Sequence, residues 1–355
     1  MTIREAIHAI VDQQRDLSEE EAAAAMREIM AGEATPAQIG AFLIALRMKG
    51  ETVEEIAGMA RVMRENALHV EVEGALLDTC GTGGDSSGTF NVSTAAAFVA
   101  AGAGVWVAKH GNRAMSSACG SADVLEALGA KIDLSPEQVS ECIREAGIGF
   151  MFAQAFHPAM KHAAGPRREI GIRTVFNILG PLTNPAGATR QLLGVARPEL
   201  APKMAAVLLR LGSEHALVVH GEDGLDELSL SAESTVHEVR DGEVREYRVS
   251  PEQFGLRRAK PEEVKGGTAE ENAAALRGVL TGKAGPLRDI VVLNAGAALL
   301  AADATAELGE GVRLAEKAID SGAAAERLRR FVEATRGFAA SAGHETGDTG
   351  HGLGP

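Results

Sequence analysis

The sequence predicts an α/β fold in which a small helical N-terminal domain precedes a larger α/β domain with a mostly parallel central sheet. Helix start and stop signals recur in the first 70 residues, whereas from residue 75 short apolar runs alternate with Ala-rich stretches. This alternation is typical of βαβ units. The 355-residue chain is 45% hydrophobic and 24% charged, which is enough to build the core of one large or two ordinary domains.

Three start signals define the N-terminal helices. Ser18, Thr35 and Thr52 are each followed three residues later by Glu or Gln, the pattern of a capping box. Gly32 and Gly50 stand where helices should end, because glycine favours the conformation found at helix C-termini. The apolar residues of these helices either form an oligomer interface or pack only on their own chain.

The strands of the larger domain are predicted from short apolar runs. A glycine-rich loop and a helix from Val92 to about Ala101 follow the first run. We expect strands at Ala75–Asp78, Val105–Ala108, Gln191–Val195, Ala216–His220 and Ile290–Leu293. Because helical stretches separate these runs, the strands should be mostly parallel.

The chain is expected to return to the helical layer at residues 155–185, which contain four prolines and no clear strand. We therefore predict a helical domain of residues 1–72 with a returning segment at about 163–186. The α/β domain would comprise residues 73–162 and 187–338. Residues 339–355 are rich in glycine and are expected to form a disordered tail.

The net charge of −14 argues against several classes of partner. Nucleic-acid binding needs a dense Lys/Arg surface, and an anionic membrane would repel this chain. No window approaches ~18 uninterrupted apolar residues, so no transmembrane helix is expected. Cys80, Cys119 and Cys142 form no CxxC pair and predict neither a disulfide framework nor a zinc site. Because the N-terminus also lacks a signal-peptide layout, we expect a cytoplasmic protein.

A glycine-rich loop, Gly81-Thr82-Gly83-Gly84-Asp85, directly follows the first predicted strand. Ligands of open α/β sheets bind beyond the carboxyl ends of strands, and glycines there let backbone N–H groups point at phosphate oxygens. The loop departs from the Rossmann fingerprint at Ser86 and from the Walker A loop at Thr89. It predicts a phosphate site, with a tight structural turn as the alternative.

Three further motifs suggest an anionic ligand. Asn91–Thr94 begins the next helix, where polar side chains either cap the helix or bind an anion. Lys109–Arg113 follows the second strand and is either a ligand contact or a solvated basic turn. Asp226 and Glu227 are adjacent carboxylates that suit Mg²⁺, which binds few carboxylates together with waters and substrate phosphates. The alternative for this pair is an ordinary acidic loop.

Together these motifs resemble those of anthranilate phosphoribosyltransferases over about residues 1–335. The matching motifs are GTGGD at 81–85, FNVSTA at 90–95, KHGNR at 109–113, GSADVLEALG at 120–129, HPAM at 157–160, RTVFNILGPLTNP at 173–185 and LDELS at 225–229. The resemblance implies a nucleoside phosphorylase/phosphoribosyltransferase-like fold with its active site at the hinge between the domains. It also implies a homodimer packed through the helical domains.

The reaction implied by this resemblance transfers the 5-phosphoribosyl group of phosphoribosyl pyrophosphate (PRPP) to the amine of anthranilate, with two Mg²⁺ ions per site and no assigned catalytic acid or base. The residues implied to bind PRPP are Gly81, Gly83, Gly84, Asp85, Thr89, Asn91, Ser93, Thr94, Lys109 and Ser121. Those implied to bind anthranilate are Gly81, Asn112, His157, Arg167 and Gly180. Those implied to hold the metal are Ser93, Asp226 and Glu227.

Two other functions remain open from the sequence. Another phosphoribosyltransferase or a nucleoside phosphorylase would share the phosphate loop and differ in its acceptor channel. Nucleic-acid-binding relatives of this fold tend to be basic, whereas this chain is acidic and keeps Arg167. Arg168 is adjacent, and the spacing to Gly171 and Phe176 favours Arg167 as the anthranilate contact.

Overall fold

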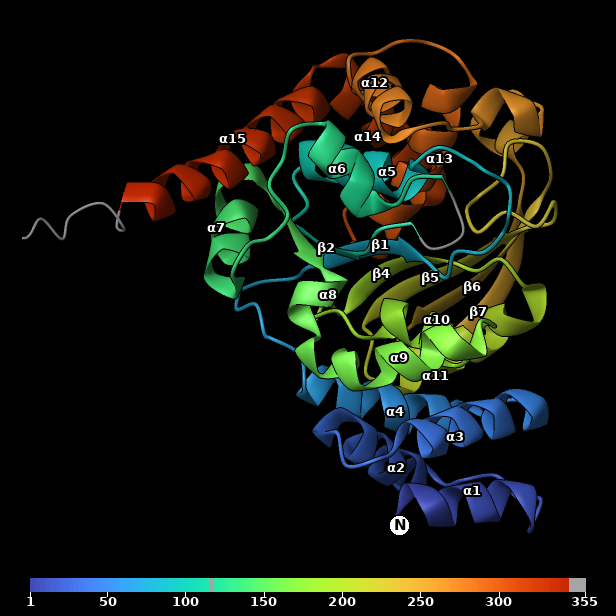
Figure 1. Ribbon diagram of the computed structural model, residues 1–355. Coiled ribbons are helices and arrows are strands. Elements are labelled where there is room, and N and C mark those ends of the chain that lie inside the picture. Colours follow the sequence, from blue (N-terminus) through green and yellow to red (C-terminus); the bar gives the residue numbers. More distant parts are fainter. Residues whose placement is uncertain (115–117, 345–355) are drawn as a thin grey trace, which may run out of the picture.

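The structure, a computed structural model, describes residues 1–114 and 118–344 (Figure 1). A layer of N-terminal helices lies on one side of a seven-stranded sheet, and a second set of helices covers the other side. The predicted fold class, a small helical domain with a larger α/β domain, is confirmed. Within the described ranges, no helix is both long and apolar enough to span a membrane.

The N-terminal layer is formed by α1 (Ile3–Val11), α2 (Glu19–Ala31), α3 (Pro36–Lys49) and α4 (Val53–Glu65). The last three begin at the predicted start signals. Ser18, Thr35 and Thr52 each accept a hydrogen bond from the backbone N–H three residues on and complete a capping box. Gly32 ends α2 in the left-handed conformation, with φ 75°, which glycine adopts at little cost.

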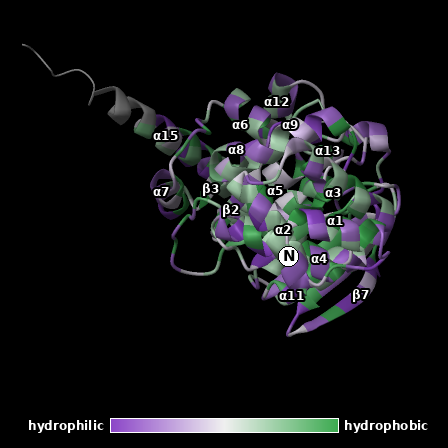
Figure 2. Ribbon diagram, turned by 60° about the horizontal axis from the view of Figure 1, so that its bottom comes forward, coloured by the Kyte–Doolittle hydropathy of each residue, from purple (hydrophilic) through white to green (hydrophobic). Residues whose placement is uncertain are grey.

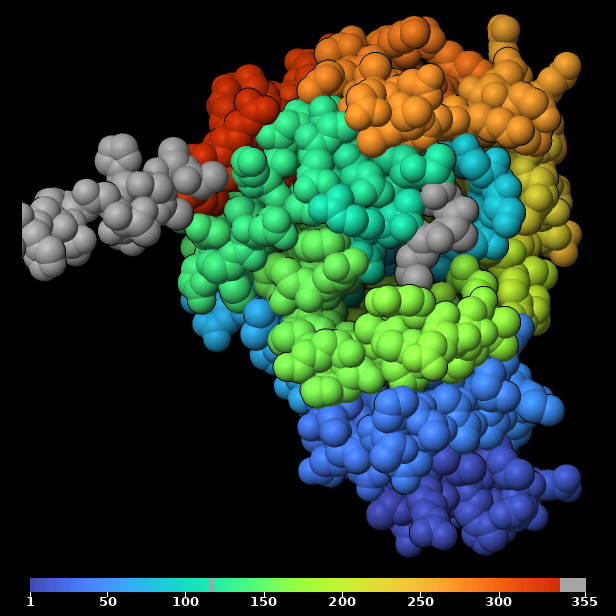
Figure 3. Space-filling view, in the orientation of Figure 1, coloured from blue at the N-terminus to red at the C-terminus, as the bar shows by residue number. Residues whose placement is uncertain are grey.

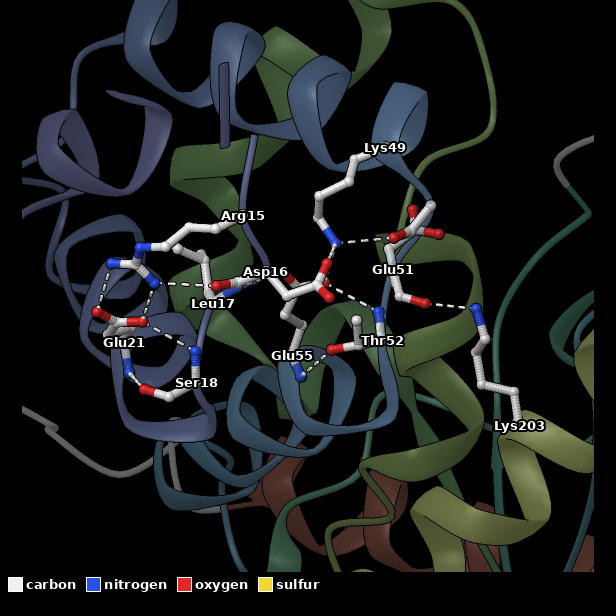
Figure 4. A network of polar contacts seen from close by, with 11 residues as sticks. Arg15, Asp16, Leu17, Ser18, Glu21, Lys49, Glu51, Thr52, Glu55 and Lys203 are labelled. Atoms are coloured by element: carbon white, nitrogen blue, oxygen red, sulfur yellow. Dashed lines mark hydrogen bonds and ion pairs between the residues drawn. The ribbon is translucent and has the colours of Figure 1, made fainter. Parts of the chain in front are cut away.

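A buried carboxylate joins three of these helices (Figure 4). The Glu55 carboxylate is fully buried and accepts hydrogen bonds from the backbone N–H of Leu17 at 2.9 Å and of Thr52 at 2.8 Å. Lys49 Nζ lies 2.9 Å from the same carboxylate and 2.6 Å from Asp16. Because Glu55 is both paired and hydrogen-bonded, its charge can be buried. The network links the start of α2, the end of α3 and the start of α4.

The sheet has the strand order β3-β2-β1-β4-β5-β6-β7. Its strands are β1 (Leu77–Gly81), β2 (Val107–Gly111), β3 (Ile148–Phe152), β4 (Arg190–Gly194), β5 (His215–Gly221), β6 (Ser234–Arg240) and β7 (Glu243–Val249). The first five are parallel, and β6 and β7 are antiparallel. From β1 the chain proceeds outward to β2 and β3, and it later returns to add β4 on the other side of β1. The strand order therefore reverses at β1, and the carboxyl ends of β1 and its neighbours form a topological switch point, where such sheets bind ligands.

Four of the five predicted strands are present, with boundaries shifted by one or two residues at their start. The fifth prediction, Ile290–Leu293, is wrong, because these residues belong to α13 (Pro286–Ala301). Every residue of α13 from Ile290 onward is buried. A helix buried on all sides shows no polar face in its sequence, so a short run of β-branched residues within it resembles a strand.

Helices cover both faces of the sheet. One face packs against α5 (Val92–Gly102), α12 (Ala269–Leu280), α13, α14 (Leu308–Asp320) and α15 (Ala323–His344). The other face packs against α11 (Ala201–Arg210) and the helical layer. The crossovers near β2 and β3 contain α6 (Ser121–Ala127), α7 (Pro136–Ala146) and α8 (Ala153–Phe156). In Figure 2, β7 is largely hydrophilic and lies at the rim of the molecule.

Residues 155–185 lie against the helical layer. α9 (Lys161–Ile170) contacts α2 and α3, and α10 (Phe176–Leu179) contacts α4. Ala163 and Leu182 share a hydrophobic core with these helices. That core also includes residues of β4 and β5, so the domain boundaries at 72, 163 and 186 stay a prediction.

The C-terminal helix is longer than expected. We predicted a tail without structure from residue 339, but α15 continues to His344. Residues 345–355, the rest of that predicted tail, lie outside the described residues.

Candidate active site

The loop after β1, here called the glycine loop (residues 81–91), has a conformation suited to binding an anion. It joins the carboxyl end of β1 to the first turn of α5. Gly83, Gly84 and Gly88 have φ angles of 61°, 81° and 66°, in a region that residues with a Cβ rarely adopt. The Gly88 carbonyl accepts a hydrogen bond from the Gly266 N–H at 2.8 Å, which fixes the outer part of the loop.

Side chains from two distant segments hold the inner part of the glycine loop. The Gly83 N–H donates to Asp226 Oδ2 at 2.9 Å. From the opposite direction, Arg173 Nη2 donates to the carbonyl oxygens of Thr82 and Gly83, each at 2.9 Å. Sequence reasoning anticipated Asp226 at this site but missed Arg173. No spacing rule identifies a side chain that acts on backbone carbonyls some 90 residues away.

The start of α5 brings together three residues assigned to PRPP. Asn91 makes no side-chain cap; its amide donates to the Cys119 carbonyl at 3.1 Å and accepts from Asn272 at 3.0 Å. Thr94 Oγ1 donates to Ser121 Oγ at 3.3 Å. The capping alternative for Asn91 is therefore excluded. Asn272, which fixes the orientation of Asn91, was not anticipated from the sequence.

Lys109 reaches from β2 to the glycine loop. Its ammonium group donates to the Thr79 carbonyl and, at 3.3 Å, to Ser93 Oγ. Burial lowers the pKa of Lys109, and the Asp78 carboxylate opposes that shift. Arg113, by contrast, is exposed and forms ion pairs with two carboxylates of α6. The KHGNR motif thus brings one cation, rather than two, to the glycine loop.

Asp226 and Glu227 form an acidic centre beside the glycine loop. Burial raises the pKa of Asp226 to about 7, and the nearby Asp85 carboxylate adds to the shift. Burial and the neighbouring Asp226 raise the pKa of Glu227 well above its ordinary value. The backbone of Ser93 is hydrogen-bonded to Glu227, so the three residues implied to hold the metal lie together.

This set of residues fits a magnesium ion. In the part of the chain that the structure describes, no three His, Cys, Asp or Glu side chains form a ready metal cage. Mg²⁺ does not need such a cage, because it keeps several waters and binds through one or two carboxylates and substrate phosphates. Burial, and then repulsion between neighbouring carboxylates, raises the pKa values of Asp226 and Glu227, and a divalent cation would relieve that repulsion.

Two buried histidines lie close together: His110 is near the carboxyl end of β2, and His157 directly follows α8. The ring centroids of His110 and His157 are 5.0 Å apart, and the Nε2 atom of each is buried without a hydrogen-bond partner. The other hydrogen bonds of the rings go to the backbone of Gly180 and Thr183. Burial lowers the pKa of His110 to about 3 and that of His157 to about 4. Both rings are therefore neutral near pH 7 and present unused Nε2 atoms.

Arg167 lies on the acceptor side, where the resemblance places anthranilate. Its guanidinium carbon is 5.0 Å from the centre of the Phe176 ring, and the side chain is half-buried, whereas Arg168 is exposed. No carboxylate lies within ion-pair distance of Arg167 among the described residues. Asn112, at the end of the KHGNR motif, is half-buried and contacts Gln154 at 3.5 Å. These positions favour Arg167 over Arg168, and its role stays a prediction.

The strands that carry the two central loops separate at their carboxyl ends. β1 and β2 share one register pair, whereas β1 and β4 share five. Asp78, fully buried, bridges the gap: Oδ1 accepts from the His110 N–H at 3.2 Å, and Oδ2 accepts from Asn184 Nδ2 at 2.8 Å. Asn184 also donates to the Ala108 carbonyl at 2.8 Å. These side chains satisfy backbone and side-chain groups where the ladder between β1 and β2 is missing.

The surface has a hollow between two segments of the chain. Figure 3 shows it between the cyan part of the chain, which includes the glycine loop, and the green part, which includes α9 and α10. A cavity of about 150 Å³ beside the loop is lined in part by Asp85, Ser87 and Thr89. A larger cavity of about 680 Å³, between α6, α7 and α15, contains no predicted site residue.

Family comparisons agree with this architecture. Residues 73–325 match the family described as "Glycosyl transferase family, a/b domain", and residues 4–67 match "Glycosyl transferase family, helical bundle domain". The two matched ranges together include the glycine loop, the acidic centre and the helical layer. The chain therefore belongs to this class of glycosyl transferases.

Comparison with individual relatives identifies one family within this class. The anthranilate phosphoribosyltransferase of Chloroflexus aggregans is 60% identical over 96% of this chain and 100% of its own. The crystal structure of the Thermus thermophilus enzyme of that name is 52% identical, with a TM-score of 0.88 over 94% of this chain and 99% of that one. The chain belongs to the anthranilate phosphoribosyltransferase family.

A more distant relative has been solved with ligands. The Saccharomyces cerevisiae anthranilate phosphoribosyltransferase in complex with PRPP and Mg is 29% identical, with a TM-score of 0.87. The same enzyme in complex with 4-fluoroanthranilate is 28% identical, with a TM-score of 0.85. Each comparison covers 94% of this chain and 98% of the other.

Proposed function

We propose that this enzyme transfers the 5-phosphoribosyl group of PRPP to the amine of anthranilate, as a step of tryptophan biosynthesis. The products are N-(5-phosphoribosyl)anthranilate and pyrophosphate. One observation carries the proposal: a hydrogen bond from Gly83 to Asp226 joins the glycine loop to the acidic centre. The described residues also include a half-buried guanidinium without an ion-pair partner among them and two neutral imidazoles. The glycine loop and the acidic centre suit a metal-bound diphosphate, whereas the guanidinium and the imidazoles suit a small aromatic acid with an amine.

On the donor side, the amides of the glycine loop bind the negative charge of PRPP. The residues proposed to hold PRPP are Gly81, Gly83, Gly84, Asp85, Thr89, Asn91, Ser93, Thr94, Lys109 and Ser121. Lys109 adds a cation near Ser93. The N-terminus of α5 adds its positive end. A chain of net charge −14 thus binds a polyanion through local groups.

Asp226, Glu227 and Ser93 are proposed to hold magnesium, with two ions per site. When bound, Mg²⁺ stabilises the negative charge that grows on the departing pyrophosphate. The chain's own residues position the donor around it. The Gly83 N–H and the Lys109 ammonium are held by hydrogen bonds within the protein, and preorganised donors of this kind contribute strongly to transition-state stabilisation.

On the acceptor side, Arg167 binds the carboxylate of anthranilate, and Gly81, Asn112, His157 and Gly180 line the approach. An aniline nitrogen is barely basic, so little proton removal is needed before it attacks. Holding two substrates in line can supply ~7–11 kcal/mol of barrier reduction. Attack on the face opposite pyrophosphate gives inversion at the anomeric carbon.

The assembly is proposed to be a homodimer packed through the helical layer, in the cytoplasm. Met48 at the end of α3 and Val11 at the end of α1 are 84% and 55% exposed. Exposed large apolar side chains on neighbouring helices support an interface there. The described cysteines are all unpaired, which suits a reducing compartment.

The test is to follow anthranilate fluorescence after adding PRPP, with and without Mg²⁺. Emission that decays only when all three are present would support donor, acceptor and metal together. If PRPP binds and emission is unchanged, the phosphoribosyl site stands and the acceptor is wrong. A screen of other aromatic amines and nucleobases would then distinguish the phosphoribosyltransferase alternatives.

A further inference from the structure

Arg173 connects the returning segment to the glycine loop. It lies between α9 and α10, on the opposite side of the loop from the acidic centre. Its Nη2 atom donates to two successive carbonyl oxygens, those of Thr82 and Gly83, at 2.9 Å each. One guanidinium nitrogen therefore fixes the orientation of two neighbouring peptide groups of the glycine loop.

The orientation that Arg173 fixes is one in which the loop binds an anion. The Gly83 N–H, next to the carbonyls held by Arg173, donates to Asp226 Oδ2 at 2.9 Å. A carboxylate oxygen here occupies the kind of position that a phosphate oxygen would take. Holding the carbonyls on one side keeps this N–H directed to the other.

The sequence of the loop makes room for this contact. Gly83, Gly84 and Gly88 all have positive φ, but only Gly84 has an atom close to the place where a Cβ would be. At Gly84 a Cβ would overlap Arg173 Nη1, whereas at Gly83 and Gly88 it would meet nothing within 4 Å. Glycine at position 84 thus serves both the backbone conformation and the approach of the guanidinium.

The positive charge of Arg173 remains available to the glycine loop. Within residues 1–114 and 118–344, no Asp or Glu lies within ion-pair distance of Arg173, unlike Arg113 and Arg197. Asp226 and Asp85 act on it from farther away. Its hydrogen bonds go to backbone carbonyls, so no counter-ion must be displaced when a polyanion approaches.

We propose that Arg173 is a positioning residue for the donor substrate: it fixes the Thr82–Gly83–Gly84 turn so that the loop N–H groups face the diphosphate. This inference rests on the proposed function, because it takes the diphosphate of PRPP as the ligand of the loop. Arg173 acts through the loop and not on anthranilate, so its loss should change donor affinity alone.

The experiment compares Arg173→Ala, Arg173→Lys and the control Arg168→Ala. A hydrogen bond to a charged group contributes ~1.5–3 kcal/mol, so Arg173→Ala should raise the KM for PRPP about tenfold or more. The KM for anthranilate should stay within about twofold. Arg173→Lys should recover part of the loss, because an ammonium can still reach one carbonyl. Arg168→Ala, an exposed neighbour, should match the parent.

Titration calorimetry with inorganic pyrophosphate and Mg²⁺ separates this inference from the proposed function. If the parent binds pyrophosphate but does not consume anthranilate, the acceptor is wrong and the Arg173 comparison can still be made. Arg173→Ala binding pyrophosphate as tightly as the parent would overturn the inference. So would a lower melting temperature with unchanged donor affinity, since that is the result of a purely structural role.

A double-mutant cycle tests the geometry. Gly84→Ala should weaken pyrophosphate binding much less in the Arg173→Ala background than in the parent, because its Cβ then has nothing to displace. Gly83→Ala, with the same positive φ and no neighbour, is the matched control and should cost the same in both backgrounds. Additive losses for Gly84→Ala would contradict the proposed contact.

Discussion

The Arg167 guanidinium lies over the Phe176 ring and forms no ion pair with any described residue, so its substitution should affect binding of an acidic ligand. Arg167→Ala should raise the KM for anthranilate by about 10- to 100-fold, the equivalent of losing a charged hydrogen bond. The KM for PRPP should change little, because the glycine loop is untouched. Steady-state kinetics with each substrate varied in turn would measure both values. A collapse in PRPP affinity with normal anthranilate KM would show that Arg167 has been assigned to the wrong substrate.

The pair His110 and His157 should make the protein labile to acid. Their pKa values fall from 6.5 to about 3 and about 4 in the folded state, mainly because burial disfavours the charged ring. Each neutral ring therefore contributes stability above pH 6.5 that is lost as the pH falls toward 4. The neighbouring Lys109 and the second ring add repulsion when one ring is protonated.

Between pH 7.5 and 5 the free energy of unfolding should fall by about 2 kcal/mol per histidine. Urea unfolding at the two pH values would measure it, and His157→Asn should remove about half of the difference. The same pKa values predict that the rate with saturating Mg²⁺ shows no histidine titration between pH 6 and 8. An inflection near pH 6.5 that disappears in His157→Asn would contradict this.

At the residue scale, the sequence predicts those side chains that act through local spacing. The glycines of the loop and the Asp226–Glu227 pair could be predicted from the sequence, because each motif lies within a few consecutive residues. Arg173 and Asn184 could not, because each acts on backbone or side-chain groups about 90 to 106 residues away. Their contacts exist only once the returning segment is packed against the sheet.

At the scale of elements, burial decides what can be predicted. α2, α3 and α4 are amphipathic or capped, and each was found from its first turn. The run Ile290–Leu293 was assigned to a strand because α13 has no polar face. The opposite error concerns β3, β6 and β7, which were not predicted. β3 is buried throughout, and β7 is mostly charged, so neither shows the alternation of a half-buried strand.

The junction of α2, α3 and α4 depends on one carboxylate. Glu55→Gln should destabilise the protein by about 3 kcal/mol, since a buried ion pair loses one partner and Lys49 keeps its charge. Glutamine also offers a single acceptor where Glu55 uses two oxygens. Chemical denaturation would measure the change, with Glu54→Gln as the exposed control, expected within about 0.5 kcal/mol of the parent. Equal stability of Glu55→Gln and the parent would show that the pair contributes nothing.

At the scale of the whole molecule, the exposed apolar residues of the helical layer are expected to be covered by a second copy of the chain. Met48→Glu should convert a dimer of about twice 36.9 kDa into a monomer, because a charge buried at an interface must be desolvated. Light scattering coupled to size-exclusion chromatography would measure the mass. Val244→Glu, at an exposed apolar residue of β7, is the control and should leave it unchanged. A monomeric parent protein would refute the proposed assembly.

The incomplete pairing of β1 and β2 restricts which substitutions this protein tolerates at position 78. Both oxygens of Asp78 accept hydrogen bonds from donors that are fixed in place. An asparagine there would satisfy one donor and set its own N–H₂ against the other, so the mildest usual replacement for aspartate is closed. An apolar residue would leave the backbone N–H of His110 and one of the two N–H bonds of the Asn184 amide without an acceptor. A substitution at position 78 therefore requires a matching change at position 184. Asp78, a charged residue within a buried strand, is thus among the least replaceable residues of the sheet.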